Sequence, residues 1–227
     1  GSLVLENLKL LKKIDYLVIS FDGRKINHEK NRGINNYKNL LKVLKIAPKY
    51  CPVLTHTVIT KNNLSDYDYI LNLAKKNNFK SIFCILQGDS NIKPSGNEYK
   101  HFFKKLLRKK EKGFPISNSK AAMKFFIQWN NYNSTYSINK NEKSYKCWAG
   151  KLMCDIDTDG RISPCCNIYN KNSMNVYKDG FLKSFQKIKK PKCKTCISFS
   201  NLIEYNLLYS LRFSTILEWL KIILIKK

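Results

Sequence analysis

The feature that most constrains this chain is the grouping of its cysteines. Six of the eight cysteines lie between Cys147 and Cys196. The first residues lack a charged segment followed by a long apolar run, so we expect a cytoplasmic protein rather than an exported one held by disulfides. Grouped cysteines in such a chain more often bind metal or carry out thiol chemistry. The grouping therefore predicts a metal or cluster site in the last third of the sequence.

The Cys193-Lys-Thr-Cys196 pair is the anchor of this predicted site. Two intervening residues let the backbone curl so that both sulfurs face one centre, as in zinc knuckles and iron–sulfur loops. Two more thiolates must come from elsewhere, and Cys147 and Cys165 are the best candidates. The four cysteines are enough for one closed site.

A hairpin between the candidate ligands would carry them toward the Cys-x-x-Cys pair. Asp157-Thr-Asp-Gly160 is a turn signal, because Asp-Gly readily takes the positive φ that tight turns need. The flanking segments 151–156 and 161–164 are short and partly alternating, which suits two strands. We expect these residues to form an antiparallel hairpin.

The ligand set leaves alternatives open. Adjacent Cys165 and Cys166 cannot easily bind one centre together, and Cys165 is favoured without excluding Cys166. Cys154 could be a buried structural thiol or an alternate ligand. The whole group could also be structural, since unpaired cysteine is often a core residue.

Three segments of this region resemble the C-terminal auxiliary-cluster module of radical S-adenosylmethionine (SAM) enzymes, the SPASM and twitch type. They are Cys147-Trp148, Asp159-Gly-Arg-Ile-Ser-Pro-Cys165-Cys166 and Pro191-Lys-Cys193-Lys-Thr-Cys196. The further cysteines that follow the Cys-x-x-Cys pair in a full SPASM module are missing, so the likeness is to the one-cluster twitch version. The resemblance implies an auxiliary [4Fe–4S] cluster.

Apolar runs alternate with amphipathic segments in the first 130 residues. The expected strands are 15–23, 52–60 and 81–86, and the expected helices are 3–14, 36–47, 65–77, 97–112 and 119–130. This spacing predicts βαβ units and a parallel sheet, in which binding residues gather at the carboxyl ends of the strands. A polar loop is expected through Gly33, and Ser65-Asp-Tyr-Asp68 is interpreted as a capping box.

The same half resembles the later strands of the radical SAM barrel, through Ser20-Phe-Asp-Gly23, His28-Glu-Lys-Asn-Arg-Gly33 and Thr57-Val-Ile-Thr-Lys-Asn62. The implied fold is α/β: the second half of a partial (β/α)6 barrel, a small cysteine-rich hairpin and helix module, and a C-terminal helix. The implied cofactor-binding residues are Ser20, Asp22, Arg32, Thr57 and Gln87. Ser20 would meet the ribose, Arg32 the methionyl carboxylate, and Thr57 and Gln87 would border the cofactor. Each also has a purely structural interpretation, such as a strand end or a surface ion pair.

The sequence departs from the family in one large respect. It holds no Cys-x-x-x-Cys-x-x-Cys segment for a first cluster and no Gly-Gly-Glu-Pro segment. We therefore expect a fragment, inactive by itself, of an enzyme that would use a 5′-deoxyadenosyl radical on a peptide, sugar or small-molecule substrate. SAM and a second [4Fe–4S] cluster are expected only in the full-length parent. A degenerate relative that merely carries a cluster is the other possibility.

The expected organisation is a partial barrel over 1–130, a linker over 131–146, a twitch-like module over 147–199 and an amphipathic helix over 200–227. That last helix could touch a membrane surface or pack on the domain. The formal net charge is +26, but only 5 of the 42 basic residues are arginine, which argues against a specific nucleic-acid surface. The rival function is a basic binding protein with a structural four-cysteine zinc site.

Overall fold

The computed structural model describes residues 3–88, 90–137, 145–168, 173–189, 191–197, 200–210, 216–217 and 220. The elements up to residue 128 are η1 Leu5–Asn7, α1 Leu8–Leu11, β1 Leu17–Ser20, α2 Lys25–Arg32, α3 Tyr37–Ile46, η2 Ala47–Lys49, β2 Val53–Ile59, α4 Tyr67–Asn77, β3 Lys80–Ile85, α5 Gly96–Glu111 and α6 Lys120–Gln128. They are followed by β4 Tyr136–Ser137, β5 Asp155–Ile156, β6 Ile162–Ser163, α7 Val176–Asp179, α8 Phe181–Gln186, β7 Thr195–Cys196 and α9 Ser200–Tyr209.

The main sheet has the order β1-β2-β3, and both pairings are parallel, as the sequence predicts. A parallel bridge between Ser81 and Ile116 continues this order beyond β3. The side chain of Asn118 then occupies the same edge, because its amide groups bond the backbone N–H and C=O of Phe83 at 2.8 and 3.0 Å. Strands therefore follow one another across the sheet in chain order.

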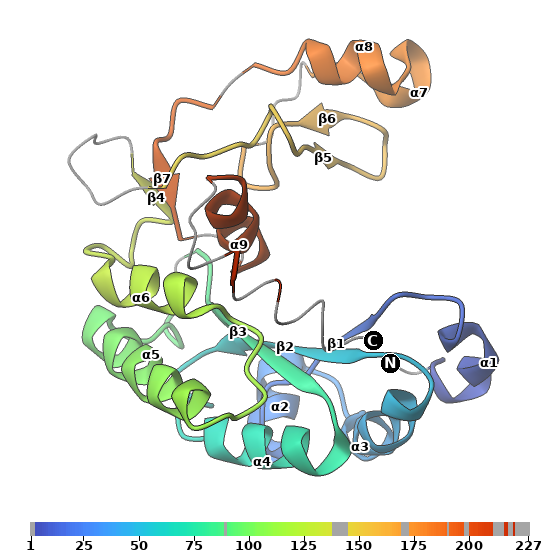
Figure 1. Cartoon of the computed structure of the whole chain (residues 1–227), viewed down its shortest axis with the longest axis vertical. Coiled ribbons are helices and arrows are strands. Elements are labelled where there is room, and N and C mark those ends of the chain that lie inside the picture. The colour runs from blue at the N-terminus through green and yellow to red at the C-terminus, as the bar shows by residue number, and fades with distance from the viewer. Residues whose placement is uncertain are drawn as a thin grey trace.

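The two faces of this sheet differ. Helices α2 to α5 lie on one face, where Phe21, Ile59 and Phe83 join a continuous apolar core (Figure 1). The opposite face is more open at β1: Val18 is 48% exposed and Ser20 is also exposed. Parallel sheets usually bury both faces, so an open face at β1 is where a ligand or further chain could lie.

Two local predictions were wrong. Helix α2 occupies residues expected to form a loop; it ends at Gly33, whose φ of 64° suits glycine. The capping box at Ser65–Asp68 does not form, because the N-cap of α4 is Asp66 and makes no side-chain cap bond. A capping box forms instead at α5, between Ser95 and Glu98.

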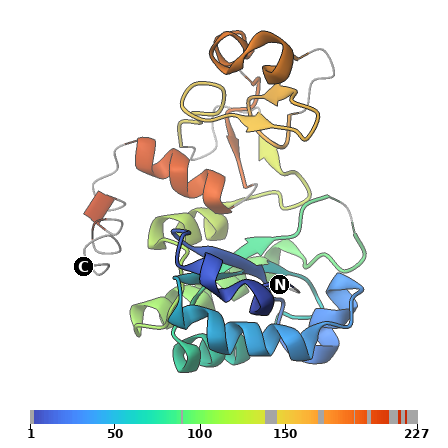
Figure 2. The ribbon, with the colours of Figure 1, turned by 90° about the vertical axis from the view of Figure 1, so that its right-hand side faces the viewer.

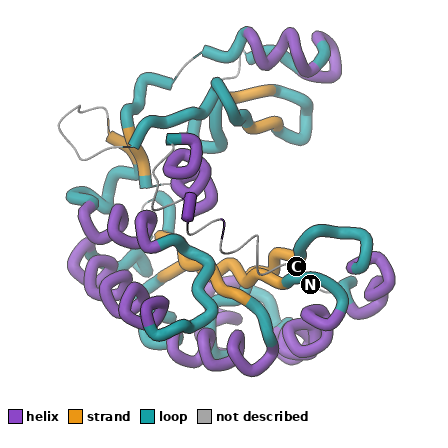
Figure 3. Tube along the Cα trace, in the orientation of Figure 1, coloured by secondary structure: helices purple, strands orange, loops and turns teal. Residues whose placement is uncertain are grey.

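Residues 145–197, hereafter the cysteine region, lie at the opposite end of the molecule from the main sheet, with α9 between them (Figures 1 and 2). Its strands are short and separate from that sheet: β5 pairs antiparallel with β6, and β7 pairs antiparallel with β4, which precedes the region (Figure 3). The β5–β6 hairpin was expected, and Gly160 has the positive φ, 84°, that its turn requires.

The segments that join the two ends are anchored by buried residues. Tyr132 and Tyr145, within the expected linker 131–146, are both part of the main core, as are Ile203 and Leu207 of α9. The described part of the C-terminal segment therefore packs on the domain. The expected helix beyond residue 210 lies almost wholly outside the described residues. Among the helices described, none is long and apolar enough to cross a membrane.

Candidate functional site

The structure brings the four candidate ligand cysteines together. Cys165 and Cys196 form a small buried cluster with Ala149, and Cys147 packs against it. Cys193 lies close enough to Cys147 and Cys165 for their charges to interact. No disulfide joins any of the eight cysteines, all of which are described. Candidate ligands from three separate stretches of chain thus gather at one place.

The group is costly to ionise without a cation. Burial raises the pKa of the Cys165 thiol. Burial is also the main cause that raises the pKa of the Cys193 thiol, and the nearby Cys147 and Cys165 raise it further. Metal ligation requires thiolates, so a positively charged centre would have to offset this cost. A bound cation would therefore lower the free-energy cost of ionising these thiols.

The neighbouring cysteines are placed differently. Cys165 is 9% exposed and belongs to the cluster, whereas Cys166 is exposed and Cys154 is half-buried outside it. Burial raises the pKa of Cys154 as well. The structure thus separates Cys165 from Cys166, which adjacency in the sequence leaves ambiguous.

Within the described residues, no three His, Cys, Asp or Glu side chains converge as the ligands of a single metal ion would. A tetrahedral zinc ion needs each sulfur about 2.3 Å from one point. A [4Fe–4S] cluster instead takes one thiolate at each of its four irons, so its ligand sulfurs need not all surround one point. The four cysteines are neighbours, but the described residues present no preformed site for a single ion.

Two donors beside these sulfurs were not expected from the sequence. The Tyr145 hydroxyl lies 3.3 Å from Cys196 Sγ, and Asn206 Nδ2 lies 3.9 Å from Cys147 Sγ. Burial is the main cause that holds the pKa of Tyr145 well above its ordinary value. An asparagine inside the apolar segment 201–210 was the only sequence signal that could have marked either residue.

At the carboxyl end of the main sheet, Asp22 and Arg32 bind each other. Arg32 Nε and Nη2 donate to the two Asp22 oxygens at 2.6 and 3.0 Å, and Val58 N–H donates to Asp22 Oδ1 at 3.1 Å. Asp22 is 1% exposed. Two of the five N–H donors of the Arg32 guanidinium therefore bind a buried carboxylate. The other edge of the guanidinium could bind a further group.

The other three predicted cofactor residues are not brought together with this pair. Ser20 lies on the open face of β1. Thr57 is fully buried on the helix-covered face, where its hydroxyl donates to Phe21 O at 2.6 Å. Gln87 links the sheet to the cysteine region, since its amide accepts from Thr135 at 2.9 Å and approaches Ile197 O at 3.4 Å.

Polar residues missed by the sequence reasoning brace the same edge. Asp66 accepts bonds from the backbone N–H and guanidinium of Arg24, at 2.8 and 2.6 Å, and from Asn27 at 2.9 Å. Gly23 lies so close to Asp66 that a Cβ would fall 2.3 Å from its carboxylate. These contacts fix the loop after β1 and the start of α2.

A histidine and a cysteine share the face of the sheet that carries Ser20. His56 pairs with Ser20 in the β1–β2 register, and its Nε2 lies 3.0 Å from Cys84 Sγ. Burial, followed by the positive charge of Arg32, lowers the pKa of His56. This pair is therefore a neutral hydrogen-bonding group near neutral pH.

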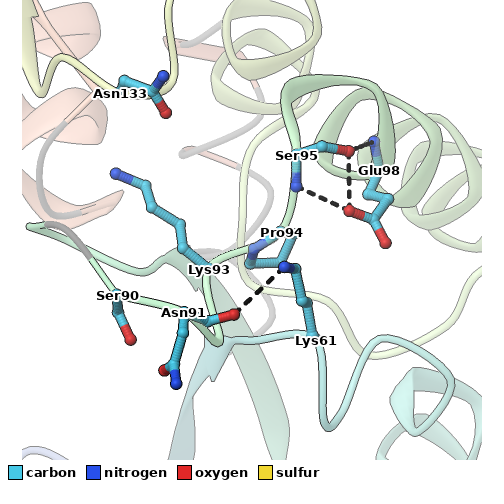
Figure 4. Close-up of a pocket in the computed structure, with 8 residues that line it drawn as sticks. All are labelled: Lys61, Ser90, Asn91, Lys93, Pro94, Ser95, Glu98 and Asn133. Atoms are coloured by element: carbon cyan, nitrogen blue, oxygen red, sulfur yellow. Dashed lines mark hydrogen bonds between the residues drawn. The ribbon is translucent and has the colours of Figure 1, made fainter.

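A polar pocket of about 550 Å³ opens at the carboxyl ends of β2 and β3 (Figure 4). Lys61 and Lys93 both line it; Lys61 Nζ donates to Asn91 O at 3.2 Å and Lys93 Nζ to Gly88 O at 2.9 Å. Glu98 also lines it, but its carboxylate is held by Ser95. None of the five predicted cofactor residues is among the described residues that line it.

The sequence matches no model of a known protein family, and no curated protein matches it.

Proposed function

We propose that this chain is part of a radical SAM enzyme and that its cysteine region holds an auxiliary [4Fe–4S] cluster. The observation that carries the proposal is the gathering of Cys147, Cys165, Cys193 and Cys196, from three separate stretches, around one buried spot. The spacing of these residues in the sequence resembles a twitch module, which holds a cluster of four irons. Each thiolate would bind one iron.

The strand order supports the barrel part of the proposal. In the main sheet the pairings run parallel in chain order, through β1, β2, β3 and the bridge at Ile116, and helices α2 to α5 lie on one face. Right-handed crossovers between strands in sequential order place every helix on the same side, as in a barrel. In a doubly wound sheet the strand order reverses and helices cover both faces. Within the described residues β1 pairs only with β2, so its other edge can accept a further strand.

The chain's own residues have defined parts in this proposal. The bound cluster would accept an electron or position substrate. The four cysteines would hold it, and Gln87 ties the chain around it to the end of β3. Ser20 and His56 present polar groups on the sheet face that would line a barrel interior. Arg32 keeps one edge of its guanidinium for an anionic group, and Asp22 fixes its orientation.

Anaerobic reconstitution with iron and sulfide tests the proposal. We expect about four irons per chain and a broad absorbance band near ~400 nm for one cluster. Changing both Cys193 and Cys196 to alanine should abolish iron retention. Cys51→Ala is the matched control, because Cys51 is also a buried thiol but lies in the core of the main sheet.

The opposite outcome is equally distinct. One tightly held zinc and no stable iron would overturn the cluster assignment, and the basic binding protein with a structural zinc site would replace it. Cys166→Ala sharpens the ligand choice: full iron retention is expected in this variant, whereas Cys165→Ala should lose it. The reverse result would exchange the two ligands.

A further inference from the structure

Two of the four candidate ligands are approached by hydrogen-bond donors that lie outside the cysteine loops. Tyr145 and Asn206 are 2% and 0% exposed, and they meet Cys196 and Cys147 respectively. Neither donor is needed to complete the set of four thiolates. Each donor lies beside a different candidate ligand, and this placement requires a separate explanation.

The orientation of Asn206 is fixed by a second bond. Trp148 N–H donates to Asn206 Oδ1 at 2.7 Å, so the amide oxygen faces the backbone and the NH2 end faces Cys147 Sγ, 3.9 Å away. Because Trp148 follows Cys147 directly, the carboxamide holds the backbone and the sulfur of one short segment together. Asn206 comes from α9, which packs on α6 and β3 and therefore holds the donor rigidly.

Tyr145 has one hydroxyl hydrogen and two possible acceptors. In the structure the Tyr145 hydroxyl donates to Cys196 O at 2.6 Å, and its Oη lies 3.3 Å from Cys196 Sγ. Its ring packs edge-on against Phe125, with centroids 4.8 Å apart, so the oxygen cannot move away. When Cys196 is a thiol, its S–H can donate to the phenol oxygen. Ligation removes that proton, and the phenol O–H can then turn from the carbonyl oxygen of Cys196 toward its anionic sulfur.

We propose that Tyr145 and Asn206 donate hydrogen bonds to the cluster thiolates of Cys196 and Cys147 and thereby raise the reduction potential of the auxiliary cluster. This rests on the proposed function. A hydrogen bond to a ligand sulfur stabilises the more negative, reduced cluster more than the oxidised one, and hydrogen bonds to charged groups are the strong ones. Both residues act through the ligands and are positioning residues.

The test is a reductive titration of the reconstituted full chain, followed by absorbance and electron paramagnetic resonance. Tyr145→Phe removes only the hydroxyl, and we expect the reduction equilibrium to become less favourable by roughly tenfold, or about 59 mV for one electron. Asn206→Asp keeps the acceptor for Trp148 but replaces the donor with a carboxylate, so a shift in the same direction is expected. The matched control is Tyr132→Phe, since Tyr132 is also buried and its hydroxyl donates to Phe126 O. Its potential should equal that of the wild type.

The outcomes separate the two proposals. If the wild-type chain holds no iron, the proposed function fails and this inference fails with it. If Tyr145→Phe and Asn206→Asp hold four irons at the wild-type potential, the inference is wrong and the cluster stands. Should a variant lose its iron, the wild-type protein still decides: its reduced cluster must show exchangeable-proton couplings that disappear in D2O. Their absence would overturn the inference.

Discussion

The main-sheet region, residues 3–132, and the cysteine region, residues 145–197, bury very different interiors. The first shares one continuous core that includes fully buried aromatic residues such as Phe21, Phe83 and Phe103. The cysteine region has its own buried cluster of only Ala149, Cys165 and Cys196 among the described residues. Other buried residues of this region, among them Ile162 and Thr195, lie outside that cluster, and Tyr145 and Ile197 belong to the main core.

This difference shows where each region obtains its stability. Burial of apolar surface can hold the main-sheet region together without any cofactor. Small units with little apolar core usually depend on disulfides or metal, and this one forms no disulfide. The cysteine region is therefore expected to depend on what its thiols bind. The following predictions test that contrast.

The largest effect is expected from truncation in the main core. Phe103 is fully buried and stacks on Phe126 with centroids 4.5 Å apart. Phe103→Ala should lower the free energy of unfolding by about 3–5 kcal/mol, measured by urea denaturation. The exposed Phe181 of α8 is the control, and Phe181→Ala should cost far less. Equal losses would contradict the proposed division of stability.

Asp22 should rank next, because it is a buried charge that holds Arg32 and the loop after β1. Asp22→Asn leaves the guanidinium without its carboxylate and should destabilise the chain by about 3 kcal/mol. Denaturation midpoints of this variant and of Asp157→Asn, an exposed hairpin residue, give the comparison. An unchanged denaturation midpoint in Asp22→Asn would mean that the ion pair does not stabilise the fold.

Iron loading should affect the two regions unequally. At a free cofactor concentration about 100 times Kd, binding contributes about 2.7 kcal/mol to the state that binds. We expect amide hydrogen exchange to slow by about a hundredfold in residues 145–197, while the amides of β1 to β3 stay nearly unchanged. Uniform slowing over both regions would show that they fold as one cooperative unit.

Thr57 distinguishes a structural role from a cofactor contact. Thr57→Val keeps the shape but leaves Phe21 O without its hydroxyl donor, so a loss of about 1 kcal/mol is expected. Thr57→Ser retains the hydroxyl and should be closer to the wild type in the same urea titration. Unchanged stability of this chain, together with weaker SAM binding when Thr57→Val is made in the expected full-length parent, would instead support the cofactor role.

The smallest effect concerns pH. His28 is buried, accepts from Asp22 N–H at Nδ1, and has a pKa lowered mainly by burial. The unfolded chain therefore binds more protons below pH 6.5, so stability is full above that pH and declines as the pH falls through it. At pH 6 the loss should be less than about 1 kcal/mol. Urea midpoints at pH 7.5 and 6 measure it, and His28→Asn should weaken the dependence.

The strands could be predicted from sequence because each is a nearly continuous apolar run, and the β5–β6 hairpin because Asp159-Gly160 has few conformational choices. Helix α2 could not, since Lys25–Arg32 has little apolar periodicity and is held by Asp66, a residue 42 positions from Arg24. The same limit applies to the site. Cys165 and Cys166 look alike in sequence, and Tyr145 and Asn206 contact cysteines more than 50 residues away.

The Asn118 side chain, which bonds both backbone groups of Phe83, has a consequence for self-association. It covers one edge of the parallel sheet with a side chain that offers no ladder for another strand, while no other described segment pairs with the free edge of β1. Two copies that met through β1 would each present only a closed edge to the solvent. Such pairing stops at a two-fold dimer and cannot propagate into a fibre.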